Sequence, residues 1–187
     1  TDEPQLCVTC HNPDGTDASK RTGWSSLSSD GKGEEGIDLG YMIHGIHNAS
    51  ILIAGFGGAE NDYSEVTYPG RISNCLTCHN TDTYYENIGG RPITVGSGAS
   101  RVTPADDEAI TATAAMCQPC HSSTAAKAHM ELNGAVIPDG DPNTCDNPGS
   151  CTEAEGGRPL KGDIGKTPAS VESCPVCHGK GREFDIG

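Results

Sequence analysis

Four times along its 187 residues, this chain places two cysteines three positions apart and follows the second at once with histidine. The four copies are Cys7-Val8-Thr9-Cys10-His11, Cys75-Leu76-Thr77-Cys78-His79, Cys117-Gln118-Pro119-Cys120-His121 and Cys174-Pro175-Val176-Cys177-His178. A zinc site would need pairs of motifs close together and would leave the four histidines without a role. The C-x-x-C-H pattern is instead the attachment signature of c-type haem, so the sequence predicts four covalently bound haems and their iron.

Within each motif the cysteines and the histidine have different expected roles. The two thiols are expected to add across the vinyl groups of the porphyrin, and the adjacent histidine is expected to bind the iron from one side. The predicted attachment cysteines are Cys7, Cys10, Cys75, Cys78, Cys117, Cys120, Cys174 and Cys177. The predicted proximal ligands are His11, His79, His121 and His178.

The rest of the composition is too polar for an ordinary apolar core. Leu, Ile, Val and Phe together number only 28, and the formal net charge is −14. That combination is typical of disordered chains unless something else supplies apolar bulk, and four haems would supply it. We therefore expect a mostly irregular fold with short α-helices and little or no β-sheet, wrapped around the haems as a single tetrahaem domain over residues 1–187.

Two stretches carry clear helix signals. Residues 38–49 should form a helix capped by Asp38, and residues 122–132 are rich in alanine and should form a helix closed by Asn133-Gly134. A Thr-Pro-Ala sequence at 103–105 predicts a helix that runs into Cys117, and the same sequence at 167–169 predicts a shorter helix that runs into Cys174.

The remaining segments read as loops. Residues 12–36, 54–74 and 138–165 are rich in turn-forming residues. Residues 86–102 are rich in glycine and β-branched residues, which predicts an irregular segment or at best a short hairpin.

The spare histidines bear on the second axial position of each iron. Seven histidines are present and four are proximal, which leaves His44, His47 and His129 as candidate distal ligands. Since His44 and His47 are three residues apart on one predicted helix, they could serve two different haems. Four haems need eight axial ligands, so one position needs another group: a methionine (Met42, Met116 or Met130), water, a lysine, or a residue from outside this chain.

Three further features bear on location and partners. Cys145 and Cys151 lie outside the motifs and are expected to form a local disulfide, which needs an oxidising compartment. The sequence contains no run of about 18 apolar residues, the length that a membrane-spanning helix needs. The acidic net charge argues against binding to nucleic acid, because phosphate would be repelled. We expect an exported protein, periplasmic, extracellular or on the cell surface, whose export signal has been removed.

Several segments resemble the outer-membrane decahaem cytochromes that metal-reducing bacteria use for extracellular respiration. They are Met42-Ile43-His44-Gly45-Ile46-His47, Tyr68-Pro69-Gly70 leading into the second motif, Ala128-His129-Met130-Glu131-Leu132-Asn133-Gly134, and the last motif with Gly179. Their order and spacing are similar to the later four haems of one pentahaem domain of that family, over most of this chain.

The resemblance implies closely packed haems with two histidine ligands each, and it implies distal roles for His44, His47 and His129. It also implies electron transfer to minerals, flavins or other cytochromes at or beyond the outer membrane. The fifth haem, the flanking β-barrel domains and a lipid-anchoring cysteine of the family have no counterpart here. The sequence is therefore either a stand-alone tetrahaem relative or a portion of a longer chain.

Three functions fit these residues. The first is an electron carrier without enzyme activity, whose partners are redox cytochromes, metal oxides or flavins, and whose terminal haems could stack copies into a homo-oligomer or filament. The second is a multihaem reductase that uses one open iron. The third is a structural or storage protein held together by haem.

Overall fold

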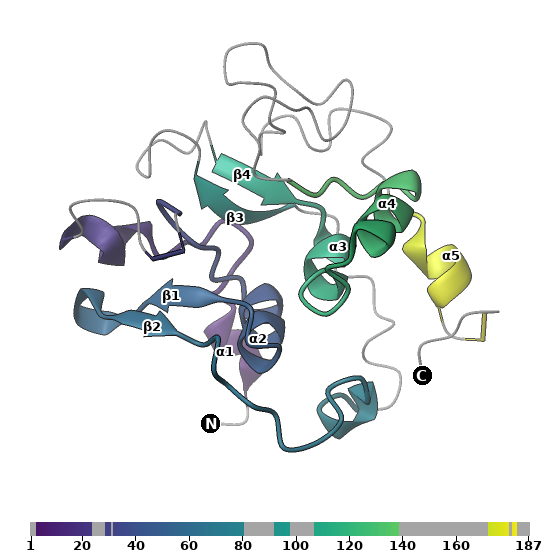
Figure 1. Ribbon diagram of the computed structural model, residues 1–187, viewed down its shortest axis with the longest axis horizontal. Coiled ribbons are helices and arrows are strands. Elements are labelled where there is room, and N and C mark those ends of the chain that lie inside the picture. The colour runs from purple at the N-terminus through teal and green to yellow at the C-terminus, as the bar shows by residue number, and fades with distance from the viewer. Residues whose placement is uncertain are drawn as a thin grey trace, which may run out of the picture.

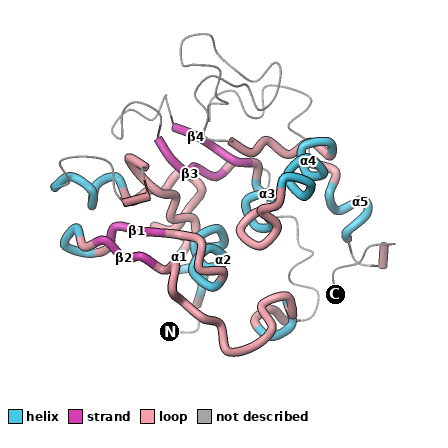
Figure 2. Tube along the Cα trace, in the orientation of Figure 1, coloured by secondary structure: helices cyan, strands magenta, loops and turns pink. Residues whose placement is uncertain are grey.

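The computed structural model describes residues 3–23, 29–30, 32–80, 92–97, 107–138, 172–179 and 181–182. Five short α-helices lie in this part of the chain: α1 (Pro4–Cys7), α2 (Leu39–His47), α3 (Ala112–Cys117), α4 (Thr124–Leu132) and α5 (Cys174–His178). Three short 3-10 segments accompany them: η1 (Ala18–Gly23), η2 (Phe56–Gly58) and η3 (Cys75–Thr77). Loops connect these elements over much of the described chain, as the pink segments of Figure 2 show.

Two small antiparallel hairpins complete the architecture. Strand β1 (Leu52–Ala54) pairs with β2 (Glu60–Asp62), with Leu52 opposite Asp62. Strand β3 (Ile93–Ser97) pairs with β4 (Asp107–Ile110), with an irregularity between Thr94 and Gly96. The fold is thus mostly irregular with short helices and little sheet, as the sequence predicts.

Helix α2 begins where the sequence predicts. The side chain of Asp38 accepts hydrogen bonds from the backbone N–H groups of Gly40 and Tyr41, which would otherwise have no partner in the first turn. The helix ends at His47, two residues before the predicted end at Ala49. In Figure 1, α2 lies beside the β1–β2 hairpin and below the β3–β4 hairpin.

The predicted helix that runs into Cys117 is wrong over residues 107–110, which form strand β4. Of its described residues, 112–117 are helical, as α3. Pairing of Ala109 and Ile110 with β3 outweighs the capping signal of the Thr-Pro-Ala sequence. Residues 86–102 are predicted to be irregular or a short hairpin, and their described part contains strand β3, whose partner β4 lies beyond that range. Strand β2 lies inside the loop predicted at 54–74.

Helix α4 confirms the prediction for residues 122–132 with a slightly later start. The Ser123 hydroxyl accepts a hydrogen bond from the backbone of Ala126, and Asn133 ends the helix. Gly134 follows with φ +92°, a conformation that glycine adopts without strain. Together α3, α4 and α5 form the side of the molecule opposite the β1–β2 hairpin in Figure 1.

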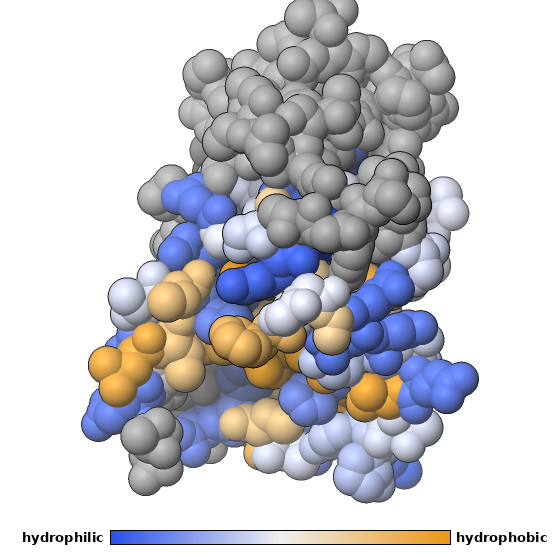
Figure 3. All heavy atoms as spheres, turned by 90° about the vertical axis from the view of Figure 1, so that its left-hand side faces the viewer, coloured by the Kyte–Doolittle hydropathy of each residue, from blue (hydrophilic) through white to orange (hydrophobic). Residues whose placement is uncertain are grey.

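A small apolar cluster joins the hairpins to the helices. Its fully covered members include Ile93, Ile110 and Ala115, with Tyr41 from α2 and Met130 from α4. Charged side chains are buried beside it, foremost Asp17, Arg21 and Glu35. On the face in Figure 3, apolar side chains (orange) form small areas separated by hydrophilic ones (blue).

Some predictions fall outside the described residues. They are the helix that runs into Cys174 from 167–169, the loop over 139–165 and the disulfide between Cys145 and Cys151. Among the described helices, none has the length and apolar character that crossing a membrane requires.

Candidate haem-binding site

Three of the motifs fold as a single hydrogen-bonded turn that closes on the histidine, and the fourth is a short helix. The backbone N–H of the histidine donates to the carbonyl of the first cysteine in His11, His79 and His121, each at 2.9 Å, and the fourth motif forms α5. Residues three and four apart lie on the same side of a helical turn. The two thiols and the imidazole of each motif therefore leave the backbone in a common direction, which suits three attachments to one porphyrin.

The motif cysteines do not assemble into zinc sites. None of the eight is paired in a disulfide, and within the described part of the chain no group of three or more His, Cys, Asp or Glu side chains is arranged to hold a metal ion. The histidine that directly follows each cysteine pair favours haem attachment.

Three histidines have their Nδ1 atom against a backbone carbonyl. Nδ1 of His11 lies 2.8 Å from Ile37 O, Nδ1 of His44 lies 2.8 Å from Gly40 O, and Nδ1 of His47 lies 2.8 Å from Ile43 O. A carbonyl oxygen can only accept, so Nδ1 carries the proton and donates it. Nε2 is then left with its lone pair, which is the arrangement found in metal-binding histidines.

The structure brings His44 together with the histidine of the second motif. The ring centroids of His44 and His79 are 6.1 Å apart, with an angle of 13° between the ring planes. Two metal–nitrogen bonds of about 2 Å, plus the distance from each nitrogen to its ring centre, give a separation of about 6 Å. The spacing is therefore that of two imidazoles on opposite sides of one iron.

His129 and His178 show the same spacing. Their centroids are also 6.1 Å apart, but their planes cross at 86°. Helix α4 supplies one ring and α5 supplies the other. Residues far apart in the sequence thus form a second pair that fits an iron.

His47 lies in a different setting. Its ring meets the edge of Tyr68, with centroids 5.8 Å apart and an angle of 87°. The next residue, Asn48, donates a hydrogen bond from its side chain to the carbonyl of Pro119 in the third motif. Among the described residues, no second histidine is placed against His47, His11 or His121, so these three stay unassigned to pairs.

The protonation of His44 favours metal binding. Burial lowers the pKa of His44, the hydrogen bond to Gly40 opposes that effect, and the nearby His79 and His47 add to the lowering. The neutral imidazole is the form that ligates iron.

All three methionines proposed for the eighth ligand pack in or against the apolar cluster. Met130 is 7% exposed within it, and Met42 and Met116 lie against its edge. Any side chain at Gly40 would meet the sulfur of Met116, so this sulfur rests against the first turn of α2. This arrangement favours a packing role for the methionines.

The second, third and fourth motifs converge. Burial raises the pKa of the Cys117 thiol to about 11, and the nearby Cys174 and Glu172 add to the effect, as do Cys120 and Cys75. Cys75 and Cys174 belong to the motifs on either side, so their influence on Cys117 shows that the three attachment points share one region. The first motif is joined to the start of α2, where the N–H of Leu39 donates to His11 O at 3.1 Å.

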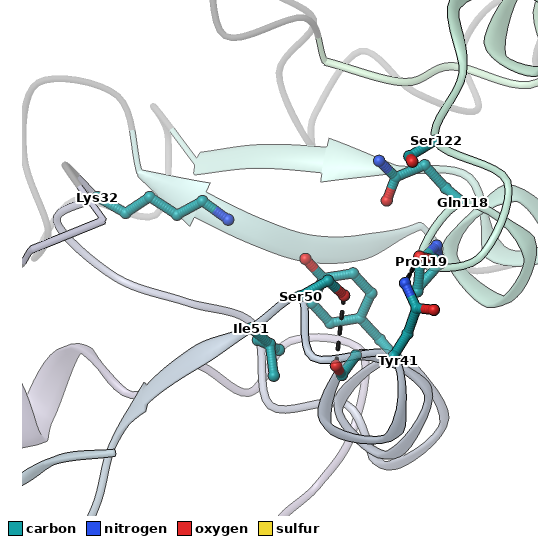
Figure 4. A pocket seen from close by; sticks show the side chains of 9 residues that line it. Lys32, Tyr41, Ser50, Ile51, Gln118, Pro119 and Ser122 are labelled. Carbon is teal, nitrogen blue, oxygen red and sulfur yellow. Dashed lines mark hydrogen bonds between the residues drawn. The ribbon is translucent and has the colours of Figure 1, made fainter. Parts of the chain in front are cut away.

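A pocket of about 200 Å³ lies between α2 and the third motif. Figure 4 shows Tyr41, Ser50 and Ile51 on one side, Gln118, Pro119 and Ser122 on the other, and Lys32 reaching toward the space. This volume is below the about 300–1,000 Å³ typical of small-molecule sites.

Paired histidines, repeated C-x-x-C-H turns and a minimal apolar core together define the class of multihaem c-type cytochromes. Over its whole length, residues 1–187, the chain matches the family model described as outer membrane cytochrome MtrC/MtrF-like, domains II/IV, and it belongs to that family. Neither the curated proteins nor the solved structures gave a match. The family confirms the resemblance seen in the sequence and supports haem c, an exported electron carrier and redox partners.

Proposed function

We propose that this chain binds four haems c through its four motifs and conducts electrons among them without chemistry on an organic substrate. The observation that carries the proposal is the spacing of the two histidine pairs, His44 with His79 and His129 with His178, each at 6.1 Å. An iron with two histidine ligands has no free position for a substrate, and it changes oxidation state with little rearrangement. Residues 1–187 act as one tetrahaem domain in this proposal.

The proposed ligands follow from the contacts. His44 is the distal ligand of the haem on His79, and His129 is the distal ligand of the haem on His178. His47 serves the haem on His11 or the haem on His121. The hydrogen bonds from Nδ1 of His44 and His47 support these roles, since they orient each ring and leave Nε2 for iron.

The mass of the intact protein tests the cofactor count. The polypeptide with eight thioether bonds should exceed the bare chain by the mass of four haems, and replacement of both Cys174 and Cys177 by alanine should remove one haem. A mass equal to the bare polypeptide, or short by two haems, would sink the proposal.

Optical and EPR spectra of the ferric protein test the ligands. His44→Ala and His129→Ala should each convert one low-spin haem to high spin, while the haem count by mass stays at four. Met42→Leu, Met116→Leu and Met130→Leu are matched controls, because packing residues can be exchanged without changing a ligand. A methionine variant that gains a high-spin haem would identify that methionine as the eighth ligand.

One observation favours a second function. The seven histidines fall one short of eight ligands, so one haem could keep an open iron and act as a reductase. A high-spin five-coordinate signal in the unmodified ferric protein, with turnover of nitrite or a sulfur oxyanion, would support the reductase. A wholly low-spin spectrum would remove it.

The proposed acceptors are other cytochromes, metal oxides and flavins. The acidic surface suits partners with basic patches or cationic mineral surfaces. Stopped-flow oxidation of the reduced protein by each acceptor, at low and high ionic strength, would rank them. Assembly of copies into an oligomer or filament stays a prediction that sedimentation over a range of concentrations would test.

A further inference from the structure

The two histidine pairs have the same spacing but different ring orientations. The planes of His44 and His79 lie within 13° of parallel, and the planes of His129 and His178 cross at 86°. The inference that follows rests on the proposed function, because it takes each pair as the two axial ligands of one haem.

The chain fixes each orientation by a different device. The His44 ring is held from its own helix by the 2.8 Å hydrogen bond to Gly40 O, and Asp38 anchors the same turn. The His129 ring receives no hydrogen bond from the described residues. Its partner His178 lies on α5, which docks on the end of α4.

That docking is itself well defined. The backbone N–H of Ser173 donates to Asn133 O at 2.9 Å, and the Ser173 hydroxyl donates to the same oxygen at 3.2 Å. Asn133 ends α4 and Ser173 precedes α5, so these bonds hold together the two helices that carry the crossed rings.

Ring orientation controls the electronic structure of a low-spin ferric iron. Each imidazole donates electron density from a π orbital perpendicular to its ring. Parallel rings act on the same iron d orbital and raise it above its partner, whereas crossed rings act on two different d orbitals and leave them nearly equal. A large splitting gives a well-resolved rhombic EPR signal, and a small splitting gives a strongly anisotropic signal at low field.

We infer that this chain builds one haem with parallel ligand planes at His44/His79 and one with crossed planes at His129/His178, and that the parallel haem is the harder of the two to reduce. Parallel donation raises the orbital from which ferrous iron loses its electron, which favours the ferric form. The hydrogen bond from His44 to Gly40 O acts in the same direction, because it makes the imidazole more basic. The second and fourth motifs thus carry haems of unequal affinity for electrons.

EPR of the frozen ferric holoprotein and of two variants tests the inference. His44→Ala should lose a rhombic signal equivalent to one haem, and His129→Ala should lose a low-field anisotropic signal equivalent to one haem. If both variants lose the same class of signal, the orientations are wrong although the ligand pairs stand. If neither variant gains a high-spin haem, the proposed pairs fail as well.

A titration of the unmodified holoprotein needs no variant. As the potential is lowered, the low-field signal should disappear before the rhombic signal that His44→Ala removes. The reverse order, or a spectrum that holds rhombic signals alone, would overturn the inference.

Discussion

The two halves of the described chain both bury apolar side chains but differ in what accompanies them. The described part of residues 3–80 also buries charged side chains, with Asp17 and Arg21 at 2% and 0% exposure. Residues 107–138 instead bury several small apolar ones, among them Ala109, Ala114 and Ala115. Both regions hold haem motifs and proposed distal ligands, so the same task is met in two ways.

In the first region a single carboxylate organises the packing. Asp17 accepts hydrogen bonds from Arg21 Nε at 2.8 Å, from the Glu35 backbone at 2.8 Å and from the Ala54 backbone at 2.7 Å. Arg21 in turn donates to the carbonyls of Lys32 and Leu52. Directional bonds therefore connect η1, β1 and the segment that leads into α2.

The second region combines small buried side chains with one such carboxylate. Alanines let α3 lie tightly against its neighbours, and one carboxylate from another part of the chain completes the helix. Glu172 accepts hydrogen bonds from the Thr111 hydroxyl at 2.8 Å and from the backbones of Thr113 at 2.6 Å and Ala114 at 2.7 Å. The comparison teaches that a chain poor in large apolar residues can position haem motifs by buried ions or by small side chains.

The largest expected effect comes from removing the carboxylate at the centre of the first region. Asp17→Ala should lower the free energy of unfolding by about 3–5 kcal/mol, because it removes the nearer of the two carboxylates that face the buried guanidinium of Arg21 and the acceptor of two backbone N–H groups. Thermal or chemical denaturation of the holoprotein measures the change. Glu65→Ala, at an exposed position in the same region, is the control. Equal stability of the two variants would contradict an organising role for Asp17.

The stability of the second region should depend on the volume of its buried side chains. Ala115→Leu adds bulk at a fully buried site and should cost about 1–3 kcal/mol. Ala125→Leu makes the same change at an exposed position of α4 and should be nearly neutral. Denaturation curves of both variants decide the point, and equal curves would show that α3 is not tightly packed.

Loss of the carboxylate that caps α3 should be milder. Glu172→Ala should cost about 1–2 kcal/mol, in the range of a lost helix cap, since water can reach part of the freed N–H groups. The expected local sign is faster hydrogen exchange at the amides of Thr113 and Ala114. Unchanged exchange at these two amides would contradict the capping role.

The smallest effect is a pH dependence confined to the first region. Burial raises the pKa of Glu35 above its ordinary value, against the lowering effect of Lys32 at 2.6 Å. The folded protein then holds this proton more tightly than the unfolded chain, so the contribution is fully present below the ordinary pKa. It is lost as the pH rises through the folded pKa.

The slope is at most about 1.4 kcal/mol per pH unit for one proton. Glu35→Gln should flatten this part of the stability profile. The free energy of unfolding measured between about pH 4 and pH 8, roughly the range in which buried glutamates titrate, would show the change. Parallel profiles for the two proteins would contradict the assignment.

Local signals in the sequence predicted local structure well. Asp38 marks the start of α2, and Asn133-Gly134 marks the end of α4, because each acts on backbone groups within a few residues. The start of α3 was not predictable in this way. Its capping carboxylate, Glu172, lies 61 positions after Thr111, so the residues near α3 do not indicate it.

The histidine pairs and the buried ions could not be predicted from the sequence, for the same reason. His44 and His129 could be chosen as candidates because few histidines are spare, but their partners are set by how distant segments meet. Asp17 and Arg21 lie in a stretch whose composition reads as a solvated loop, although both are covered. The three hydrogen bonds that Asp17 accepts come from separate segments, so they cannot be predicted before the fold is known.

Helix α2 carries two proposed ligands, His44 and His47, one turn apart and each tied to a carbonyl of the same helix. One residue inserted between Asp38 and His44 would rotate both rings by about 100° about the helix axis. The motifs begin at the unequal positions 7, 75, 117 and 174, so their spacing along the chain is not itself fixed. Exposed loops between packed elements can therefore change in length, whereas any insertion or deletion within this one helix would displace two proposed iron ligands at once.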